Sequence, residues 1–150
     1  MSSALEFLVD WCIRYLENKD MVRREIESVE EKKEGSFKIK FKNGLRQFLV
    51  IEDFSAQSVA GISDDVSSGI FILNSPSNVN AFLKEWGALS KKKKLMCYFI
   101  NPFSNMDKAW IIIPYVHAMV CDPDSLEMGI KTMSEMVEYI SPSDLAKRLE

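Results

Sequence analysis

The chain contains few of the residues that usually build reactive or metal-binding sites. Its 150 residues include one histidine, three cysteines and six glycines. The glycines are scattered singly, so neither a Walker loop nor a dinucleotide-binding loop is expected. The cysteines lie far apart, are odd in number and include no C-x2-C pair. This pattern argues against a disulfide framework and against an ordinary zinc knuckle.

The chain also lacks a long hydrophobic run and a strong excess of charge. The longest apolar run, Ile111 to Cys121, is interrupted by Pro114 and His117 and is too short to span a bilayer. The net charge of −3 argues against a general nucleic-acid-binding surface. No signal peptide is recognisable at the N-terminus, so we expect a cytoplasmic protein in a reducing compartment, without a membrane partner.

The overall composition is that of an ordinary globular protein. Hydrophobic residues make up 47% of the chain and charged residues 27%. The length is sufficient for one hydrophobic core. We therefore predict a single α+β domain over residues 1–150.

The N-terminal segment has the apolar spacing of a helix. Its stripe recurs every three or four residues and consists of Leu5, Leu8, Cys12, Tyr15, Lys19, Val22, Ile26 and Val29. This periodicity predicts a helix that ends near Gly35, with a kink or break at residues 18–20.

Residues 37–54 predict a β-hairpin around Asn43-Gly44, because both residues tolerate the positive φ of a two-residue turn. Such a turn places Phe37 opposite Val50 on one sheet face. The first strand carries lysines and is expected at a sheet edge. The second is apolar on both faces at its centre and is expected inside the sheet.

The remaining elements follow from start signals and apolar runs. The predicted strands are Gly69–Leu73, Leu95–Ile100 and a long one from Ala109 to about Val120. Helices are predicted at Asn78–Leu89, after Asp122-Pro123 and after Ser141-Pro142; residues 55–68 are expected to be a mobile connection. The predicted fold is an α-β-β-β-α-β-β-α two-layer sandwich with a largely antiparallel five-stranded sheet.

Glu52 and Asp53 end an inner strand and are the first candidates for catalysis. PD-(D/E)xK nucleases resemble this chain in their opening helix and three strands. They need an acid on the second strand and an acid-x-lysine on the third to hold a divalent cation. Asp53 could supply the first acid, but the predicted third strand, GIFILN, carries neither acid nor lysine. A solvated strand end is favoured, and no catalytic residue is assigned.

The single histidine allows two further hypotheses. His117 and Cys121 form an H-x3-C pair, and with Cys97 and Cys12 they could complete a tetrahedral zinc site. His117 with a cysteine could also act in nucleophilic catalysis. Neither has a local signature, so an ordinary strand histidine and three buried thiols are favoured, and no metal or cofactor is expected.

Two sets of side chains are candidates for binding. A degenerate nuclease-like domain would contact nucleic acid through its lysines, which are Lys38, Lys40, Lys91, Lys92, Lys93 and Lys94. The alternative interpretation of the lysine run is that cations favour a helix C-terminus. Five of eight methionines fall in residues 106–136 and suggest an adaptable protein-binding surface. Its predicted members are Val79, Trp86, Met128 and Met136, and the free edge of the sheet is the alternative partner surface.

The order of elements resembles the small chaperones of type III secretion and the YbjN-like proteins. The features that carry this resemblance are the leading amphipathic helix, the Asn-Gly hairpin, the helix Asn78–Leu89, the hairpin of Leu95–Ile100 with Ala109–Val120, and the closing helix after Asp122-Pro123. The resemblance implies a non-enzymatic module that dimerises and holds an extended segment of another protein. We therefore expect a chaperone-like or adaptor protein, with the nuclease-like domain as the alternative.

Overall fold

The structure, a computed structural model, describes residues 3–64 and 66–150. In this part of the chain, six strands form one sheet in the order in which they occur in the sequence. They are β1 (Ile26–Lys33), β2 (Ser36–Phe41), β3 (Gly44–Ile51), β4 (Ser68–Leu73), β5 (Leu95–Ile100) and β6 (Ala109–Ile112). The β3–β4 and β4–β5 pairs are parallel and the others antiparallel. The sheet is thus mixed and six-stranded, which corrects the predicted five-stranded, largely antiparallel sheet.

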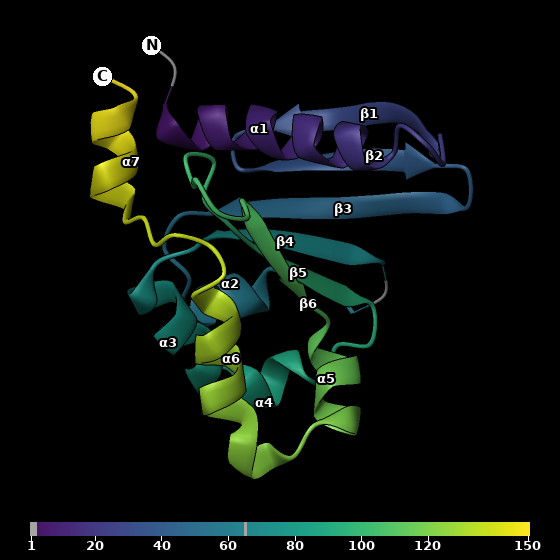
Figure 1. The fold of residues 1–150 in the computed structure, drawn as a ribbon. Helices are drawn as coiled ribbons and strands as arrows, with labels where there is room; N and C mark the ends of the chain where they lie inside the picture. The colour runs from purple at the N-terminus through teal and green to yellow at the C-terminus, as the bar shows by residue number, and fades with distance from the viewer. Residues whose placement is uncertain (1–2, 65) are drawn as a thin grey trace.

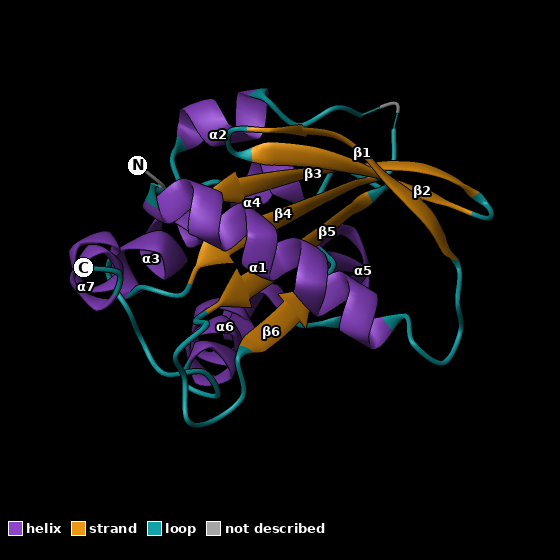
Figure 2. Cartoon of the chain, turned by 90° about the horizontal axis from the view of Figure 1, so that it is seen from above, coloured by secondary structure: helices purple, strands orange, loops and turns teal. Residues whose placement is uncertain are grey.

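Helices cover both faces of the sheet, as Figures 1 and 2 show. One face carries α1 (Ala4–Lys19), with α7 (Pro142–Arg148) at its end. The other face carries α2 (Ala56–Ala60), α3 (Pro76–Lys84), α4 (Trp86–Leu89) and α6 (Leu126–Ser134). A further helix, α5 (Pro114–Val120), and a 3-10 turn, η1 (Pro123–Ser125), join β6 to α6. The α+β class is confirmed, but the layers are three because apolar side chains project from both faces of the central strands.

The sheet separates two hydrophobic cores rich in aromatic rings. On the α1 side, Phe71 stacks on Tyr98 with ring centroids 4.4 Å apart. On the other side, Phe99 stacks on Trp110 at 4.3 Å and meets the edge of Phe82 at 5.0 Å. Each fully buried large side chain contributes about 1.5–3 kcal/mol through its removal from water. The central strands β4 and β5 are therefore the most tightly held part of the fold.

The predicted long N-terminal helix is wrong beyond residue 19. Asp20 ends α1 and accepts backbone hydrogen bonds from Glu25 and Ile26, each 2.9 Å long, and the chain then reverses into β1. A register shift between Ile26 and Ser28 marks a bulge, which lets Ile26 and Val29 both pack against the α1-side core. A bulge inserts one residue into the alternation of a strand. The three-residue spacing between Ile26 and Val29, which led to the helix prediction, therefore comes from this bulge.

The Asn-Gly hairpin is present, with a register that differs from the prediction by two residues. Phe37 lies opposite Phe48 and Phe41 opposite Gly44, so the loop consists of Lys42 and Asn43. A shift of two preserves the alternation of faces. The predicted edge position of β2 is wrong because β1 pairs with it, whereas the interior position of β3 is confirmed.

The predicted strand from Ala109 to Val120 ends early. Strand β6 stops at Ile112, and Pro114 occupies the first turn of α5, where a missing N–H costs no hydrogen bond. The predicted helix at Asn78–Leu89 is confirmed as α3 and α4, which begin after the capping residue Ser75. The start signals at Asp122-Pro123 and Ser141-Pro142 are also confirmed.

Candidate functional site

The carboxyl ends of the parallel strands β3, β4 and β5 form the edge where α/β sheets usually bind ligands. Polar residues follow each of these strands. Glu52 and Asp53 follow β3, Asn74 follows β4, and Asn101 follows β5. Asn78, in the first turn of α3, lies beside them.

Asn74 is fully buried and binds three groups from distant parts of the chain. Its Nδ2 donates to the carbonyl oxygens of Ser134 at 3.0 Å and Val137 at 2.9 Å. Its Oδ1 accepts a hydrogen bond of 2.9 Å from Trp110 Nε1. The hydrogen bonds of the Asn74 side chain therefore connect β4 to β6, to the end of α6 and to the segment that follows it.

Asn78 and Asn101 fasten the same edge in the same way. Asn78 Oδ1 accepts from the Phe54 N–H at 2.9 Å, and its Nδ2 donates to the carbonyls of Glu52 at 2.7 Å and Leu73 at 2.8 Å. Asn101 donates to the Glu138 carbonyl at 3.0 Å. Apart from Asn74 Oδ1, which accepts from the Trp110 side chain, the polar atoms of these buried amides bind backbone groups and so stabilise the loops. The sequence reasoning missed them, although Asn74 and Asn101 each directly follow an apolar strand.

Glu52 and Asp53 do not meet the other groups that a nuclease site needs. Burial, and then the nearby charge of Asp53, raise the pKa of Glu52. Because residues 26–33 form an additional first strand, β2 (SFKIKF) and β3 (GLRQFLVI) are the second and third strands of the sheet. Neither of them contains an acid. Among the described residues, no three His, Cys, Asp or Glu side chains lie close enough to hold a metal ion.

The predicted nucleic-acid-binding lysines belong to two separate parts of the fold, and several pair with acids. Lys38 and Lys40 lie on β2, where their ammonium groups are 2.9 Å from Glu31 and 3.7 Å from Glu27 on β1. Lys91 to Lys94 lie in the turn between α4 and β5. There Lys92 binds Asp64 at 2.9 Å, and Lys93 lies over the Tyr115 ring at 5.8 Å.

The proposed four-residue zinc set is not assembled within the chain. Cys12 is buried in the core beneath α1, and Cys97 in the core on the opposite face of the sheet. Burial raises the pKa of both thiols, which makes them poor nucleophiles and ligands. Two predictions from the sequence are wrong. His117 lies in helix α5 and not in a strand, and Cys121 is exposed and not buried.

The four predicted partner-binding residues have different surroundings. Val79 is only 2% exposed, so it serves the core and leaves the candidate set. Trp86 is half-buried between Phe82 and His117. Met128, in α6, and Met136, just after it, are exposed and accessible to another molecule.

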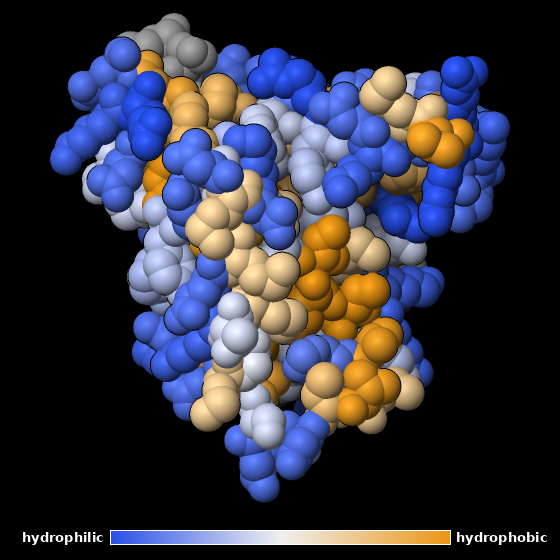
Figure 3. Space-filling view, in the orientation of Figure 1, coloured by the Kyte–Doolittle hydropathy of each residue, from blue (hydrophilic) through white to orange (hydrophobic). Residues whose placement is uncertain are grey.

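A larger apolar surface lies elsewhere, at the last strand of the sheet and the helix that follows it. We call it the β6–α5 surface, and its exposed members are Ile111, Val116, Met119 and Val120. Figure 3 shows hydrophobic side chains gathered over this part of the molecule. The signal in the sequence was the segment 109–121, which contains no Asp, Glu, Lys or Arg.

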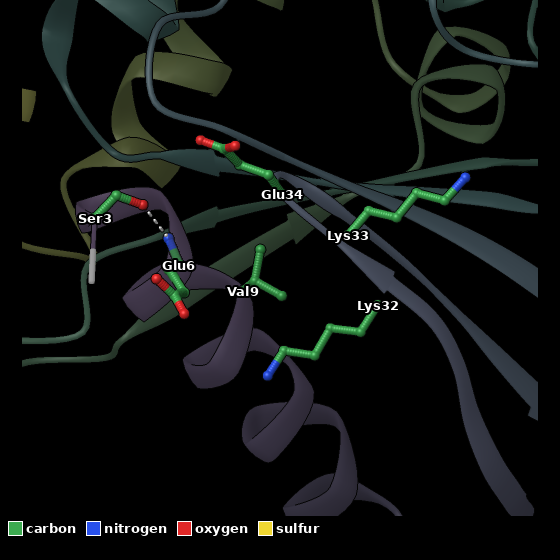
Figure 4. A pocket seen from close by; sticks show the side chains of 6 residues that line it. All are labelled: Ser3, Glu6, Val9, Lys32, Lys33 and Glu34. Atoms are coloured by element: carbon green, nitrogen blue, oxygen red, sulfur yellow. Dashed lines mark hydrogen bonds between the residues drawn. The ribbon is translucent and has the colours of Figure 1, made fainter. Parts of the chain in front are cut away.

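A hollow of about 430 Å³ lies between the N-terminal half of α1 and the end of β1, and Figure 4 shows the side chains that line it. Two acids and two bases surround Val9 in this hollow. The residues that line it are Ser3, Glu6, Val9, Lys32, Lys33 and Glu34. The Ser3 hydroxyl accepts a hydrogen bond of 3.0 Å from the Glu6 N–H, as a helix cap. The Ser3 hydroxyl is thus engaged in capping the helix.

Comparison of the chain with protein-family models, curated proteins and solved structures gave no match. The resemblance to secretion chaperones and YbjN-like proteins therefore stays a prediction. Within the described residues, no helix is both long and apolar enough to cross a membrane.

Proposed function

We propose that the protein is a non-enzymatic binding module, chaperone-like or adaptor-like, that holds an extended segment of another protein. The observation that carries the proposal is the β6–α5 surface, where an edge strand and exposed apolar side chains occur together.

The backbone of β6 would bind the partner segment through hydrogen bonds. In the described part of the chain, β6 is last in the sheet and pairs with β5 alone. Its outward N–H and C=O groups can therefore hydrogen-bond an added strand, as in β-augmentation. Because β6 has only four residues, the bound segment would be short.

The side chains of the β6–α5 surface would bind the partner segment through apolar contact. Ile111 on β6 and Val116, Met119 and Val120 on α5 expose apolar area that a partner would remove from water. The surrounding segment 109–121 has no formally charged side chain. The segment that fits here is therefore apolar and extended, because an acidic or basic peptide would lose hydration without gaining an ion pair.

An aggregation assay with reduced insulin as the client tests the proposal. We expect the wild-type protein to suppress the aggregation of insulin B chains, and Ile111→Lys with Val120→Lys to abolish the effect. Met21→Lys is the matched control, since Met21 is 69% and Val120 75% exposed and Met21 lies in the turn after α1, outside the β6–α5 surface. No suppression by the wild type, or equal loss in the control, would contradict the proposal.

Nucleic-acid binding remains the second candidate because of one cluster of cations. Arg46 of β3, Lys93 and Lys94 line the same small hollow at the start of β4 and β5. A phosphate could lie between them. Mobility-shift assays at low salt test this: binding that weakens with salt and is lost when Lys93 and Lys94 become Glu would favour it, and an unshifted band would exclude it.

A further inference from the structure

We infer that His117 and Cys121 form one half of a tetrahedral zinc site, and that the same two residues of a second copy of this chain complete it. The inference goes beyond the proposed function: its ligands, His117 and Cys121, are not members of the β6–α5 surface, although Val116 and Val120 of that surface lie beside them.

The first observation is the distance between the two ligand atoms. Cys121 Sγ lies 3.7 Å from His117 Nδ1. In a tetrahedral zinc site, a Zn–S bond of about 2.3 Å and a Zn–N bond of about 2.05 Å place the two ligand atoms roughly 3.6 Å apart. The observed separation therefore matches that of two ligands of one zinc ion.

The local backbone and one aromatic neighbour hold this geometry. The residues are four apart at the end of α5, and the Cys121 N–H donates to the His117 carbonyl at 3.0 Å. The edge of one ring meets the face of the other where Trp86 packs on His117, with centroids 5.6 Å apart. Cys121 is exposed and His117 half-buried, so a metal ion can reach the pair from solvent.

The rest of the described chain does not complete the site. No third His, Cys, Asp or Glu joins the pair, and the thiols of Cys12 and Cys97 are buried. A structural zinc site needs four ligands. Two of the four must therefore come from another molecule.

A second copy supplies the missing ligands by symmetry. A twofold axis through the ion gives two histidines and two cysteines, an N2S2 set that zinc prefers. Two thiolates balance the charge of Zn²⁺, so the complex is neutral and suits the uncharged segment 109–121. Val116 and Val120 are both exposed. They precede the two ligands by one residue each and form the adjacent row of the helix, which provides apolar contact around the ion.

The test is a zinc titration of the full chain, with light scattering, in a buffer that contains a phosphine reductant to prevent disulfides. We expect one zinc per two chains and a doubling of the 17.2 kDa mass, reversed by EDTA. Cobalt should replace zinc and give the visible absorption of a tetrahedral thiolate complex.

Variants separate this site from an incidental one. Cys121→Ser and His117→Gln should each lower zinc affinity at least about 100-fold and leave the protein monomeric at the same zinc concentration. Met21→Ser, at an exposed residue in the turn after α1, should behave as wild type. One zinc per monomer, no zinc binding, a dimer that persists in EDTA, or unchanged binding in Cys121→Ser would each overturn the inference. None of these results depends on the insulin assay, so the two proposals fail separately.

Discussion

The sheet has two outer strands, and they present different side chains to water. Five of the eight residues of β1, read as IESVEEKK, are charged, and two of its acids pair with lysines on β2. Strand β6, read as AWII, carries no charge and is followed by an exposed apolar helix. Charged side chains discourage the addition of another strand. The comparison indicates that charged side chains protect the β1 edge against association, whereas β6 carries no charge that would protect its edge.

The largest expected effect on stability comes from removing the Asn74 side chain, which links β6 to β4 and to the segment after α6. Asn74→Ala removes the hydrogen bonds to Trp110, Ser134 and Val137 and leaves their buried groups unpaired. We expect a loss of about 3 kcal/mol in the free energy of unfolding, measured by urea denaturation.

Hydrogen exchange would show whether the loss is local. Amides of β6 should exchange much faster in Asn74→Ala, whereas those between β1 and β2 should keep their protection relative to the global stability. Equal acceleration at both edges would show that Asn74 supports the whole sheet and not the β6 edge in particular.

Substitutions that make β1 less charged or β6 charged should have a smaller effect on stability. Their main effect should be on association. Glu27→Val with Glu30→Val lowers the number of charged residues in β1 from five to three, and we expect concentration-dependent association that the wild-type β1 edge does not allow. Ile111→Lys should change the free energy of unfolding by no more than about 0.5 kcal/mol, because the side chain is already exposed. Sedimentation velocity and urea denaturation measure the two results, and a non-associating Val variant would contradict the comparison.

The smallest effect concerns Glu52, which lies between the two edges. Its pKa is raised in the folded protein, mainly by burial, so the folded state binds its proton more tightly than the unfolded chain does. This carboxyl therefore costs stability as the pH rises through and above its ordinary value of 4.5. Glu52→Gln should be slightly more stable than wild type at pH 7, and the difference should vanish near pH 3. A variant that is less stable at pH 7 would contradict this account.

The sequence predicted those elements whose signals lie within a few neighbouring residues. Ser75-Pro76, Asp122-Pro123 and Ser141-Pro142 each start a helical segment, as expected from capping oxygens and from proline at the first turn. The apolar runs of β4 and β5 also appear at the predicted positions. In these places, the local backbone preference agrees with the final packing.

The failures occur where a remote contact overrides the local pattern. Residues 26–33 form β1 because β2 offers an unpaired row of backbone groups, and a bulge hides the alternation. Pro114 was read as an interruption of a strand, although it begins α5. Among the candidate site residues, Val79 is buried, while the β6–α5 surface went unrecognised because the segment was assigned wholly to a strand.

By itself, the sequence determined the mixed composition of helices and strands, the starts of several helices, the apolar central strands and the uncharged character of residues 109–121. Only the tertiary structure decided that this uncharged segment lies at the open edge of the sheet, and that His117 and Cys121 face each other while the other two thiols are buried. The reason is physical: capping and turn preferences depend on adjacent residues, whereas exposure, strand order and the meeting of side chains depend on which distant segments pack together.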